Sequence, residues 1–301
     1  MNNVVIIGSG PAGLTAGIYL ARASLQPIII AGDKPGGQLI STDIVENYPG
    51  FETINGADLM MRMLSHAEVV GSKILHDSVQ DIKKENGCFS LQLLSGDAIL
   101  SRTIVIATGA QHKHLNIPGE AKFAGKGVSW CATCDGPIFR DKKVAVIGGG
   151  NTAVMQVTFL SQFTEHVFLI HRRNKLRAEE FAQKKLFANN NVSCLWDSEI
   201  IEIIGDEKVK SIKIRNNMTN MDTYLEVDGV FIAIGTMPSS EFVKNLVSLD
   251  EEGYVITHDT KTTCDGIFAA GDIVSGSLKQ AVYAAGHGAL VAKYVQEFLS
   301  A

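Results

Sequence analysis

The sequence predicts an α/β protein built from two similar units, and three observations support this prediction. The chain has 301 residues, enough for two domains of about 150 residues each. Hydrophobic residues make up 46% and charged residues 20%, as in an ordinary globular protein. One order of features occurs at residues 4–30 and again at residues 144–170: a short apolar run, a glycine-rich turn, a helical pattern and a second apolar run.

The first repeat begins with residues 4–7 (VVII), which are apolar without alternation, as buried parallel strands are. A helical pattern covers residues 14–23, and a second apolar run covers residues 27–30. Residues 8–13 (GSGPAG) lie between strand and helix with the spacing GxGxxG. This context predicts a dinucleotide-binding turn; the alternative is a glycine turn in an unrelated α/β domain.

Each glycine of this turn has its own expected role. Gly8 permits a tight turn, Gly10 lets the backbone approach a pyrophosphate, and Gly13 lets the helix pack on the strand. The first helical turn then offers free amides and a partial positive charge to the phosphates. The repeat therefore predicts a Rossmann-like unit.

The second repeat has the same order. Residues 144–147 form the predicted strand, residues 148–153 (GGGNTA) the turn, residues 154–163 the helix and residues 167–170 the next strand. Ala153 occupies the third small position of the fingerprint. We therefore expect a second dinucleotide site here.

Basic residues directly after the second repeat indicate which nucleotide binds. His171, Arg172 and Arg173 follow the strand, and Arg177 lies one turn further on. An NAD site places an acid near this point, whereas guanidinium groups match the 2′-phosphate of NADPH in charge and geometry. The pattern predicts NADPH; the alternative is a solvated basic turn.

The first repeat has no such arginines. Its second strand ends at Ala31, which cannot serve as the acidic ribose ligand expected at this position. Asp33 is a candidate ribose ligand, and the alternative is a solvated loop aspartate.

Three later segments extend the two units. Residues 104–109 form a strand that ends in a small-residue turn, and residues 230–235 mirror it in the second half, which indicates an internal duplication. Residues 266–272 form another strand and precede a helix at residues 278–299. Its terminal Asp272 suits a polar ligand group, or else caps that helix.

Charge and hydropathy exclude several classes of protein. The net charge of −5 gives no support for binding to nucleic acid or to an anionic membrane. No apolar run approaches the roughly 20 residues of a membrane helix. No targeting pattern precedes the first strand, so we expect a cytoplasmic protein.

The five cysteines do not form a disulfide scaffold, because Cys88, Cys194 and Cys264 are isolated in the sequence. Cys131 and Cys134 form a C-x-x-C pair, a spacing typical of a redox disulfide or of half a zinc site. No second ligand pair lies near it, so we predict a redox pair and no metal; inert thiols are the remaining alternative.

Asp135 follows the pair directly. In a protein that also binds a flavin and NADPH, a dithiol can pass electrons to another disulfide by thiol–disulfide exchange. Because the leaving thiolate needs a proton, we expect Asp135 to be the acid, directly or through water. The alternative is a turn residue before Gly136 and Pro137.

Taken together, these motifs resemble the low-molecular-weight thioredoxin reductases, and the resemblance covers essentially the whole chain. Several motifs are common among flavoproteins, but their joint order and spacing are highly specific. The motifs are residues 8–13, 36–39 (GGQL), 45–50 (VENYPG), 107–109 (ATG), 131–136 (CATCDG), 148–153, 171–173 with Arg177, and 268–272 (FAAGD).

The resemblance implies a discontinuous FAD domain, residues 1–111 and 242–301, with an NADPH domain that carries the dithiol inserted at residues 112–241. It implies a homodimer, thioredoxin as substrate, and Cys134 as the thiol nearer the flavin. It also implies that the inserted domain rotates, since nicotinamide and dithiol must both reach the flavin. The alternative is a fixed geometry with the dithiol on the opposite face of the flavin.

The resemblance also assigns cofactor-binding residues. For FAD they are Gly8, Ser9, Gly10, Pro11, Ala12, Gly13, Gly37, Gln38, Leu39, Asn47, Val79, Ala107, Thr108, Gly109, Gly271, Asp272, Lys279, Gln280 and Ala281. For NADPH they are Gly148, Gly150, Asn151, Thr152, Ala153, His171, Arg172, Arg173, Arg177, Ile234 and Gly235.

Three departures from the family pattern stand out. Lys279 replaces a frequent arginine and lacks its planar fork, Met155 and Gln156 replace acidic residues, and Trp130 occupies a variable position before the dithiol. Alternative interpretations are a ferredoxin–NADP reductase of the thioredoxin-reductase-like type, which lacks the dithiol, and an alkyl hydroperoxide reductase flavoprotein, which carries an extra N-terminal redox domain. A nucleotide-binding redox sensor or scaffold is the non-enzymatic alternative.

Overall fold

The computed structural model describes residues 1–32, 35–42, 44–85 and 87–301, and its contacts divide the chain into two compact units. The first unit comprises residues 1–111 and 237–301, and the second comprises residues 112–236. Residues 237–241, which we expected in the second unit, therefore belong by their contacts to the first.

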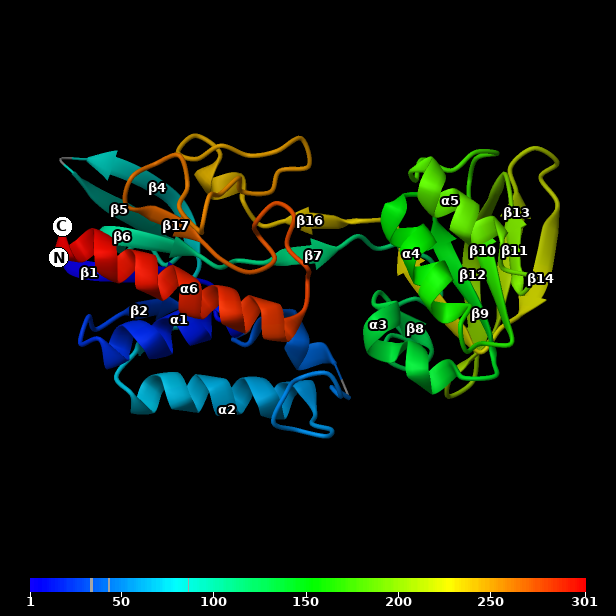
Figure 1. Cartoon of the computed structure of the whole chain (residues 1–301), viewed down its shortest axis with the longest axis horizontal. Coiled ribbons are helices and arrows are strands. Elements are labelled where there is room, and N and C mark those ends of the chain that lie inside the picture. Colours follow the sequence, from blue (N-terminus) through cyan, green and yellow to red (C-terminus); the bar gives the residue numbers. More distant parts are fainter. Residues whose placement is uncertain (33–34, 43, 86) are drawn as a thin grey trace. The chain divides into compact units, whose positions relative to one another are not determined.

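The first unit is built on a mixed sheet whose central strands are parallel (Figure 1). Antiparallel strands extend it on one side. In spatial order the strands are β3 (Lys73–Leu75), β2 (Ile28–Ile30), β1 (Asn2–Ile7), β6 (Ala98–Ile106), β5 (Cys88–Leu93) and β4 (Val79–Glu85), and β17 (Ile267–Ala269) also pairs with β6.

Alternate residues of β1 face two separate cores. Val4 and Ile6 pack with the helices, and Val5 and Ile7 pack with residues from the 243–274 segment. Figure 1 shows α1 and α6 side by side on the helical face. The helices are α1 (Pro11–Arg22), α2 (Gly56–Val69) and α6 (Ala281–Ser300), with short 3-10 helices η1 (Gly37–Ser41) and η3 (Glu241–Val243).

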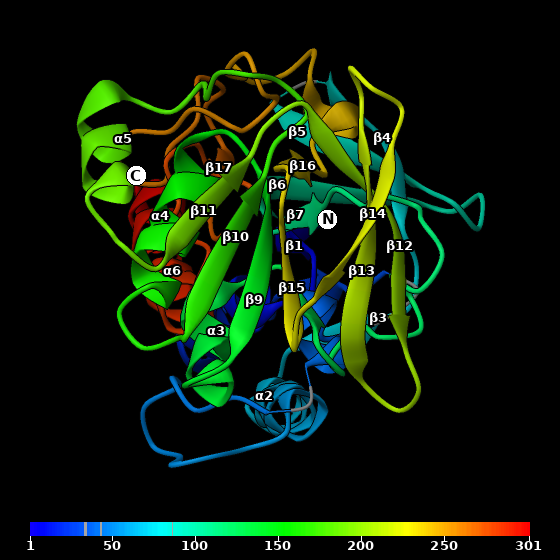
Figure 2. The same cartoon turned by 90° about the vertical axis from the view of Figure 1, so that its right-hand side faces the viewer.

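The second unit has a parallel sheet covered by helices on one face and by an antiparallel sheet on the other (Figure 2). The parallel strands, in spatial order, are β11 (Val192–Leu195), β10 (His166–Ile170), β9 (Lys143–Gly148), β15 (Gly229–Ala233) and β8 (Val128–Ser129). The helical face carries α3 (Ala132–Asp135), η2 (Gly136–Phe139), α4 (Asn151–Leu160) and α5 (Glu180–Phe187), and the antiparallel sheet is β12 (Ser198–Gly205), β13 (Val209–Asn216) and β14 (Asp222–Glu226).

The chain passes between the units along two paired strands, β7 (Ala110–His112) and β16 (Thr236–Pro238). Backbone hydrogen bonds continue this pairing on both sides, from Ser239 N to Gly109 O and from Lys113 N to Gly235 O. No helix in the described ranges is long and apolar enough to cross a membrane.

The predicted α/β class with two similar units is confirmed, and the differences lie at helix ends. Both fingerprint helices begin earlier than predicted, at Pro11 and Asn151, directly after the glycine that precedes each of them. The C-terminal helix begins later, at Ala281, because Lys279 has a left-handed φ of 57° and Gln280 is extended.

Two glycines of α6 predict opposite effects of substitution by alanine. A Cβ at Gly288 would lie 2.2 Å from Ala12 O on α1, whereas a Cβ at Gly286 would meet nothing within 4 Å. Gly288→Ala should lower the free energy of unfolding by about 1–3 kcal/mol through overpacking. Gly286→Ala should raise it by up to about 1 kcal/mol through helix propensity. Urea denaturation of the flavin-free protein measures both free energies of unfolding. Equal changes in the two variants would contradict the close packing of α6 on α1 at Gly288.

Candidate functional site

The first glycine turn lies where β1 ends and α1 begins. A Cβ at Gly8 would lie 2.2 Å from Ala107 O, and one at Gly13 would lie 1.9 Å from Gly8 O. In contrast, a Cβ at Gly10 would meet nothing within 4 Å, and no side chain caps the N-terminus of α1. The turn is thus closely packed at Gly8 and Gly13 and open at Gly10, and no capping side chain occupies the start of α1 in the part of the chain that the structure describes. This arrangement fits a pyrophosphate.

Ser9 connects this turn to the next part of the predicted FAD site. Its hydroxyl donates to Ala31 O and accepts from Gly36 N, each at 3.0 Å. A Cβ at Gly37 would lie 3.4 Å from Gly10 Cα. The structure therefore brings residues 36–37 to the glycine turn. Asp33, whose contact with ribose the sequence left open, lies outside the described residues.

The segment after β17 approaches the same turn. A Cβ at Gly271 would lie 2.8 Å from the Ala12 Cβ, and Gly271 N donates to His287 Nδ1 at 3.2 Å. Burial raises the pKa of Asp272, while Lys279 and Ser277 act in the opposite direction. Asp272 does not cap α6, because that helix begins at Ala281 with Gln280 as its N-cap.

Lys279 and Gln280 both have partners within the first unit. Lys279 Nζ donates to the Tyr254 hydroxyl at 2.9 Å and lies 4.6 Å from the centre of that ring. Gln280 Oε1 accepts from Asn47 Nδ2 at 3.2 Å. Two predicted FAD residues that are 233 positions apart in sequence therefore meet.

The remaining predicted FAD residues fall into three places. Thr108 Oγ1 donates to Ser239 O at 2.8 Å, beside Gly109. Val79 and Leu39 pack against the two core clusters of the first unit, while Gln38 is exposed.

The second glycine turn repeats the geometry of the first. A Cβ at Gly148 would lie 2.4 Å from Ala233 O and 2.8 Å from the Ala153 Cβ. A Cβ at Gly150 would meet nothing within 4 Å, and no side chain caps the N-terminus of α4. This turn also fits a dinucleotide phosphate.

The basic loop after β10 is tied to this second turn. Gly149 O accepts from Arg177 N at 2.7 Å and from Ala178 N at 3.2 Å. The His171 ring lies against Gly149, where a Cβ would come within 2.2 Å of it. Burial lowers the pKa of His171, and the arginine charges lower it further, although its bond to Lys175 O acts the other way. Burial thus favours the neutral form of His171, whose ring packs on Gly149.

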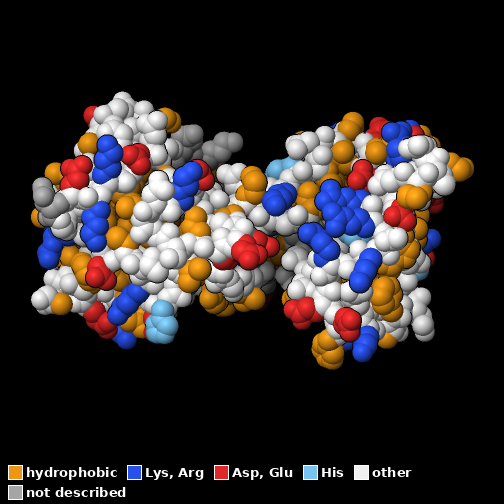
Figure 3. Space-filling model, turned by 90° about the horizontal axis from the view of Figure 1, so that it is seen from above, with side chains coloured by type: hydrophobic (Ala, Val, Ile, Leu, Met, Phe, Trp, Pro, Cys, Tyr) orange, Lys and Arg blue, Asp and Glu red, His pale blue; other side chains and the backbone are white. Residues whose placement is uncertain are grey.

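The three arginines of this loop, Arg172, Arg173 and Arg177, are exposed. Figure 3 shows Lys and Arg side chains gathered on one face of the second unit. The loop therefore carries its positive charges on the surface, where a phosphate can reach them.

Other predicted NADPH residues are engaged with protein groups. Asn151 Oδ1 accepts from Glu179 N at 2.8 Å, and its Nδ2 donates to Glu179 Oε1 at 3.3 Å. Thr152 is exposed, Ile234 packs against the core, and Gly235 lies in the passage to β16. Sequence reasoning missed Glu179, which only the fold brings to Asn151.

Cys131 and Cys134 form a disulfide across the first turn of α3, with their Cα atoms 5.3 Å apart. Cys134 N lies 3.2 Å from Cys131 Sγ, and Thr133 Oγ1 lies 3.3 Å from it. A Cβ at Gly136 would lie 3.1–3.3 Å from side-chain atoms of Leu160, Phe163 and Phe159. The absence of a side chain at Gly136 therefore lets the dithiol segment pack on α4.

Asp135 accepts a hydrogen bond on Oδ2 from Ser129 Oγ at 2.5 Å. Burial raises the pKa of Asp135, and the bond from Ser129 acts in the opposite direction. Its side chain makes no capping bond to η2. The structure thus provides a partly buried carboxyl, stabilised in its protonated form by burial, one residue from Cys134.

The Trp130 ring contacts the rings of two histidines. The ring centre of His112 lies 6.0 Å away in a stacked arrangement, and that of His114 lies 5.2 Å away edge-on. The sequence separates these histidines from the cysteines, yet the fold places them on the residue before Cys131. Within the described ranges, no group of three His, Cys, Asp or Glu side chains is arranged to hold a metal.

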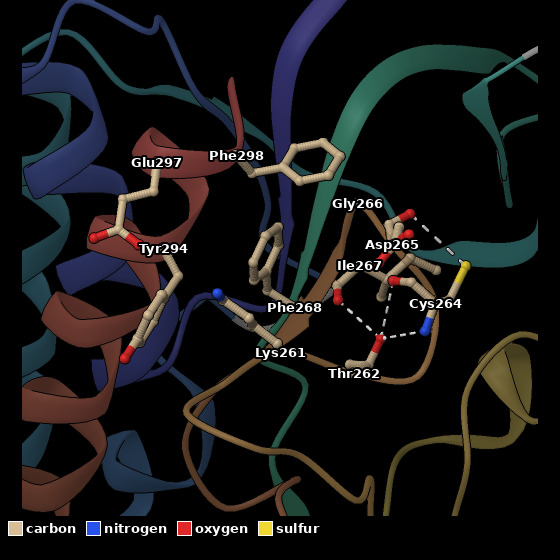
Figure 4. A pocket seen from close by; sticks show the side chains of 10 residues that line it. All are labelled: Lys261, Thr262, Cys264, Asp265, Gly266, Ile267, Phe268, Tyr294, Glu297 and Phe298. Carbon is tan, nitrogen blue, oxygen red and sulfur yellow. Dashed lines mark hydrogen bonds between the residues drawn. The ribbon is translucent and has the colours of Figure 1, made fainter. Parts of the chain in front are cut away.

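A pocket of about 270 Å³ lies near the end of α6 (Figure 4). Lys261, Cys264, Tyr294 and Glu297 are among its lining residues, and Figure 4 shows Tyr294, Glu297 and Phe298 coming from the helix. None of the predicted cofactor residues lines it.

Comparison with known proteins agrees with this site. The family model for pyridine nucleotide-disulphide oxidoreductases matches residues 2–288. The chain belongs to this family, and within it to the low-molecular-weight thioredoxin reductases. Membership implies the use of FAD and of a pyridine nucleotide.

The individual matches extend over nearly the full length of each protein. The chain is 43% identical to a thioredoxin reductase of Streptomyces coelicolor, over 100% of this chain and 95% of that protein. It is 44% identical to one of Rickettsia felis, over 99% and 98%. The solved thioredoxin reductase of Streptococcus pyogenes MGAS5005 matches with a TM-score of 0.95 at 39% identity, over 100% and 98%. The family resemblance that we predicted is confirmed.

Sequence reasoning missed several residues that complete the site. Ser129, Tyr254 and His287 act through partners that are distant or unremarkable in sequence. For Ser129 there was a weak signal, since a serine two residues before a cysteine can bond back to its amide.

Proposed function

We propose that the protein reduces the disulfide of thioredoxin with electrons from NADPH, passed through FAD and the Cys131–Cys134 pair. The observation that carries this proposal is the formed C-x-x-C disulfide with a partly buried carboxylic acid beside it. Two open glycine turns in the same chain support the two nucleotides. The similarity to thioredoxin reductases over the full chain supports thioredoxin as the substrate.

We assign FAD to the first unit and NADPH to the second. Gly10, Gly37 and Asp272 would lie along FAD, and the amides at the start of α1 would bind its pyrophosphate. Gly150 and the α4 amides would bind the pyrophosphate of NADPH, with Arg172, Arg173 and Arg177 on its 2′-phosphate. His171 would support this loop by packing on Gly149, where burial favours its neutral form.

Bound FAD supplies two-electron transfer between NADPH and the disulfide. In the reduced pair, one thiolate attacks a sulfur of the thioredoxin disulfide, and the other thioredoxin sulfur leaves. The second thiol of the pair then attacks the mixed disulfide as a thiolate. This restores the Cys131–Cys134 bond and leaves thioredoxin with two thiols.

Asp135 supplies the proton in this scheme. A leaving thiolate is stabilised when it takes a proton, and an acid is useful only if it is protonated near neutral pH. Burial raises the pKa of Asp135 and so favours the protonated form, in accordance with this role. The homodimer, the approach of Cys134 to the flavin and the rotation of the NADPH domain remain predictions from the family resemblance.

The proposed relay predicts that loss of either cysteine abolishes thioredoxin reduction but not flavin reduction by NADPH. Cys131→Ser or Cys134→Ser should abolish thioredoxin reduction, because exchange needs both sulfurs. NADPH should still bleach the yellow flavin, since hydride transfer involves no sulfur. Anaerobic NADPH titration followed by addition of thioredoxin measures both steps. Cys194→Ser is a control that removes a partly buried free thiol. A doubly substituted protein that reduces thioredoxin at the normal rate would refute the relay.

The assignment of NADPH to the second unit predicts that loss of the loop arginines weakens the binding of NADPH more than that of NADH. Replacing Arg172 and Arg173 by Ala should weaken NADPH binding by roughly 1.5–3 kcal/mol for each charge-assisted hydrogen bond to the 2′-phosphate that is removed. NADH, which has no 2′-phosphate, should be affected far less. Lys175→Ala removes a charge from the same loop and serves as the matched control. Titration calorimetry compares the nucleotides, and equal weakening of both would contradict the assignment.

A further inference from the structure

Ser129 lies at the end of β8 and is buried, with 4% of its surface exposed. Its hydroxyl makes three contacts within the dithiol segment. It donates to Asp135 Oδ2 at 2.5 Å, accepts from Cys131 N at 3.0 Å, and lies 3.4 Å from Cys131 O. The side chain therefore joins the acid to the backbone of the first cysteine.

The valence of a hydroxyl explains how one serine can serve both states of the acid. A hydroxyl has one proton to donate and two lone pairs that accept. When Asp135 is ionised, Ser129 donates to the carboxylate and accepts from Cys131 N. When Asp135 is protonated, its O–H can donate to Ser129 Oγ, and the serine proton can turn toward Cys131 O. In both states each of these donors has an acceptor.

The described elements next to Asp135 carry no charged side chain that could bind its carboxyl in place of Ser129. The neighbouring elements β8, η2 and α4 carry no Asp, Glu, Lys, Arg or His. Arg140, directly after η2, lies over the Phe163 ring at 5.8 Å. His112 and His114 contact Trp130. The titratable groups nearest in sequence are the two thiols of the reduced pair.

We propose that Ser129 is a positioning residue that holds Asp135 toward the dithiol and partners its carboxyl in both protonation states. This inference rests on the proposed role of Asp135 as the acid of thiol–disulfide exchange. Removal of the hydroxyl leaves the acid buried without this donor, so its protonated form becomes still more favoured. The proton would then be held more tightly and at a less defined position.

Gln156 provides a matched control, because it supports the same segment without touching the acid. Its Nε2 donates to Trp130 O at 3.0 Å from α4. Loss of this bond loosens the backbone between Ser129 and Cys131 but leaves the Ser129–Asp135 contact in place. The two side chains thus separate general support of the segment from direct control of the carboxyl.

The test compares Ser129→Ala, Ser129→Thr, Ser129→Val, Gln156→Ala and Asp135→Asn in the flavin-loaded enzyme. The readout is the pH profile of kcat/KM for thioredoxin, whose high-pH limb falls as the acid loses its proton. Flavin content and Tm report folding. Thr and Val have nearly the same shape, so their difference isolates the hydroxyl if Ala folds poorly.

In Ser129→Ala and Ser129→Val we expect the high-pH limb to move upward by about 1 unit or more, with kcat reduced about tenfold. Ser129→Thr should keep the high-pH limb where it lies in the unaltered enzyme. Gln156→Ala should lower the rate without moving this limb. The role of Ser129 alone would be overturned if the high-pH limb of kcat/KM stayed in place in Ser129→Ala and Ser129→Val but disappeared in Asp135→Asn. A limb that persists in Asp135→Asn would overturn the acid assignment on which this inference rests.

Discussion

The close approach of a helix to the end of a strand is the constraint on which both candidate nucleotide sites depend. In the first unit a Cβ at Gly13 would lie 1.9 Å from Gly8 O, and in the second a Cβ at Gly148 would lie 2.8 Å from the Ala153 Cβ of α4. Only positions without side chains allow these distances. Gly10 and Gly150, the N-cap residues of α1 and α4, border open space, since a Cβ at either would meet nothing within 4 Å. The close packing of helix and strand therefore accounts both for the crowding on one side of each turn and for the open space at Gly10 and Gly150, where a pyrophosphate would fit.

The dithiol segment depends on a similar absence of side-chain atoms and on a few polar bonds. Gly136 lets the segment lie against α4, and Gln156 and Ser129 then fix the backbone around Trp130 and Cys131. A helix as short as α3, with 4 residues, is not stable by itself, since helix nucleation is costly. Its position is therefore set by these tertiary contacts, and so is the place of the Asp135 carboxyl beside the disulfide.

Much of this architecture could be predicted from the sequence, because it is encoded locally. The apolar runs of β1 and β9 and the glycine spacing after them identify both turns without any knowledge of distant contacts. Contacts between distant residues could not be predicted in this way. Asn47 meets Gln280, and Lys279 meets Tyr254, only because the elements that separate them in sequence fold back on one another. The start of α6 was predicted too early because the left-handed conformation of Lys279 has no local signature.

The two candidate sites differ in how they carry charge, and the difference follows from the role proposed for each. Recognition of a phosphate is favoured by basic groups that a ligand can reach, and Arg172, Arg173 and Arg177 are exposed, with guanidinium groups whose planar fork matches a phosphate. Transfer of a proton requires a group that changes charge, and a nearby fixed charge would hold Asp135 in one state. The elements β8, η2 and α4 beside Asp135 carry no such charge. Burial raises the pKa of Asp135, and the hydrogen bond from Ser129 acts in the opposite direction. A neutral hydroxyl can reverse its hydrogen bond as the carboxyl gains or loses its proton, which an ammonium or guanidinium cannot do. The helix α4 carries no acids, and Met155 and Gln156 occupy its first turns. This composition suits both proposed roles, because it would avoid repulsion of a bound phosphate and leaves no second carboxyl on the helix next to Asp135.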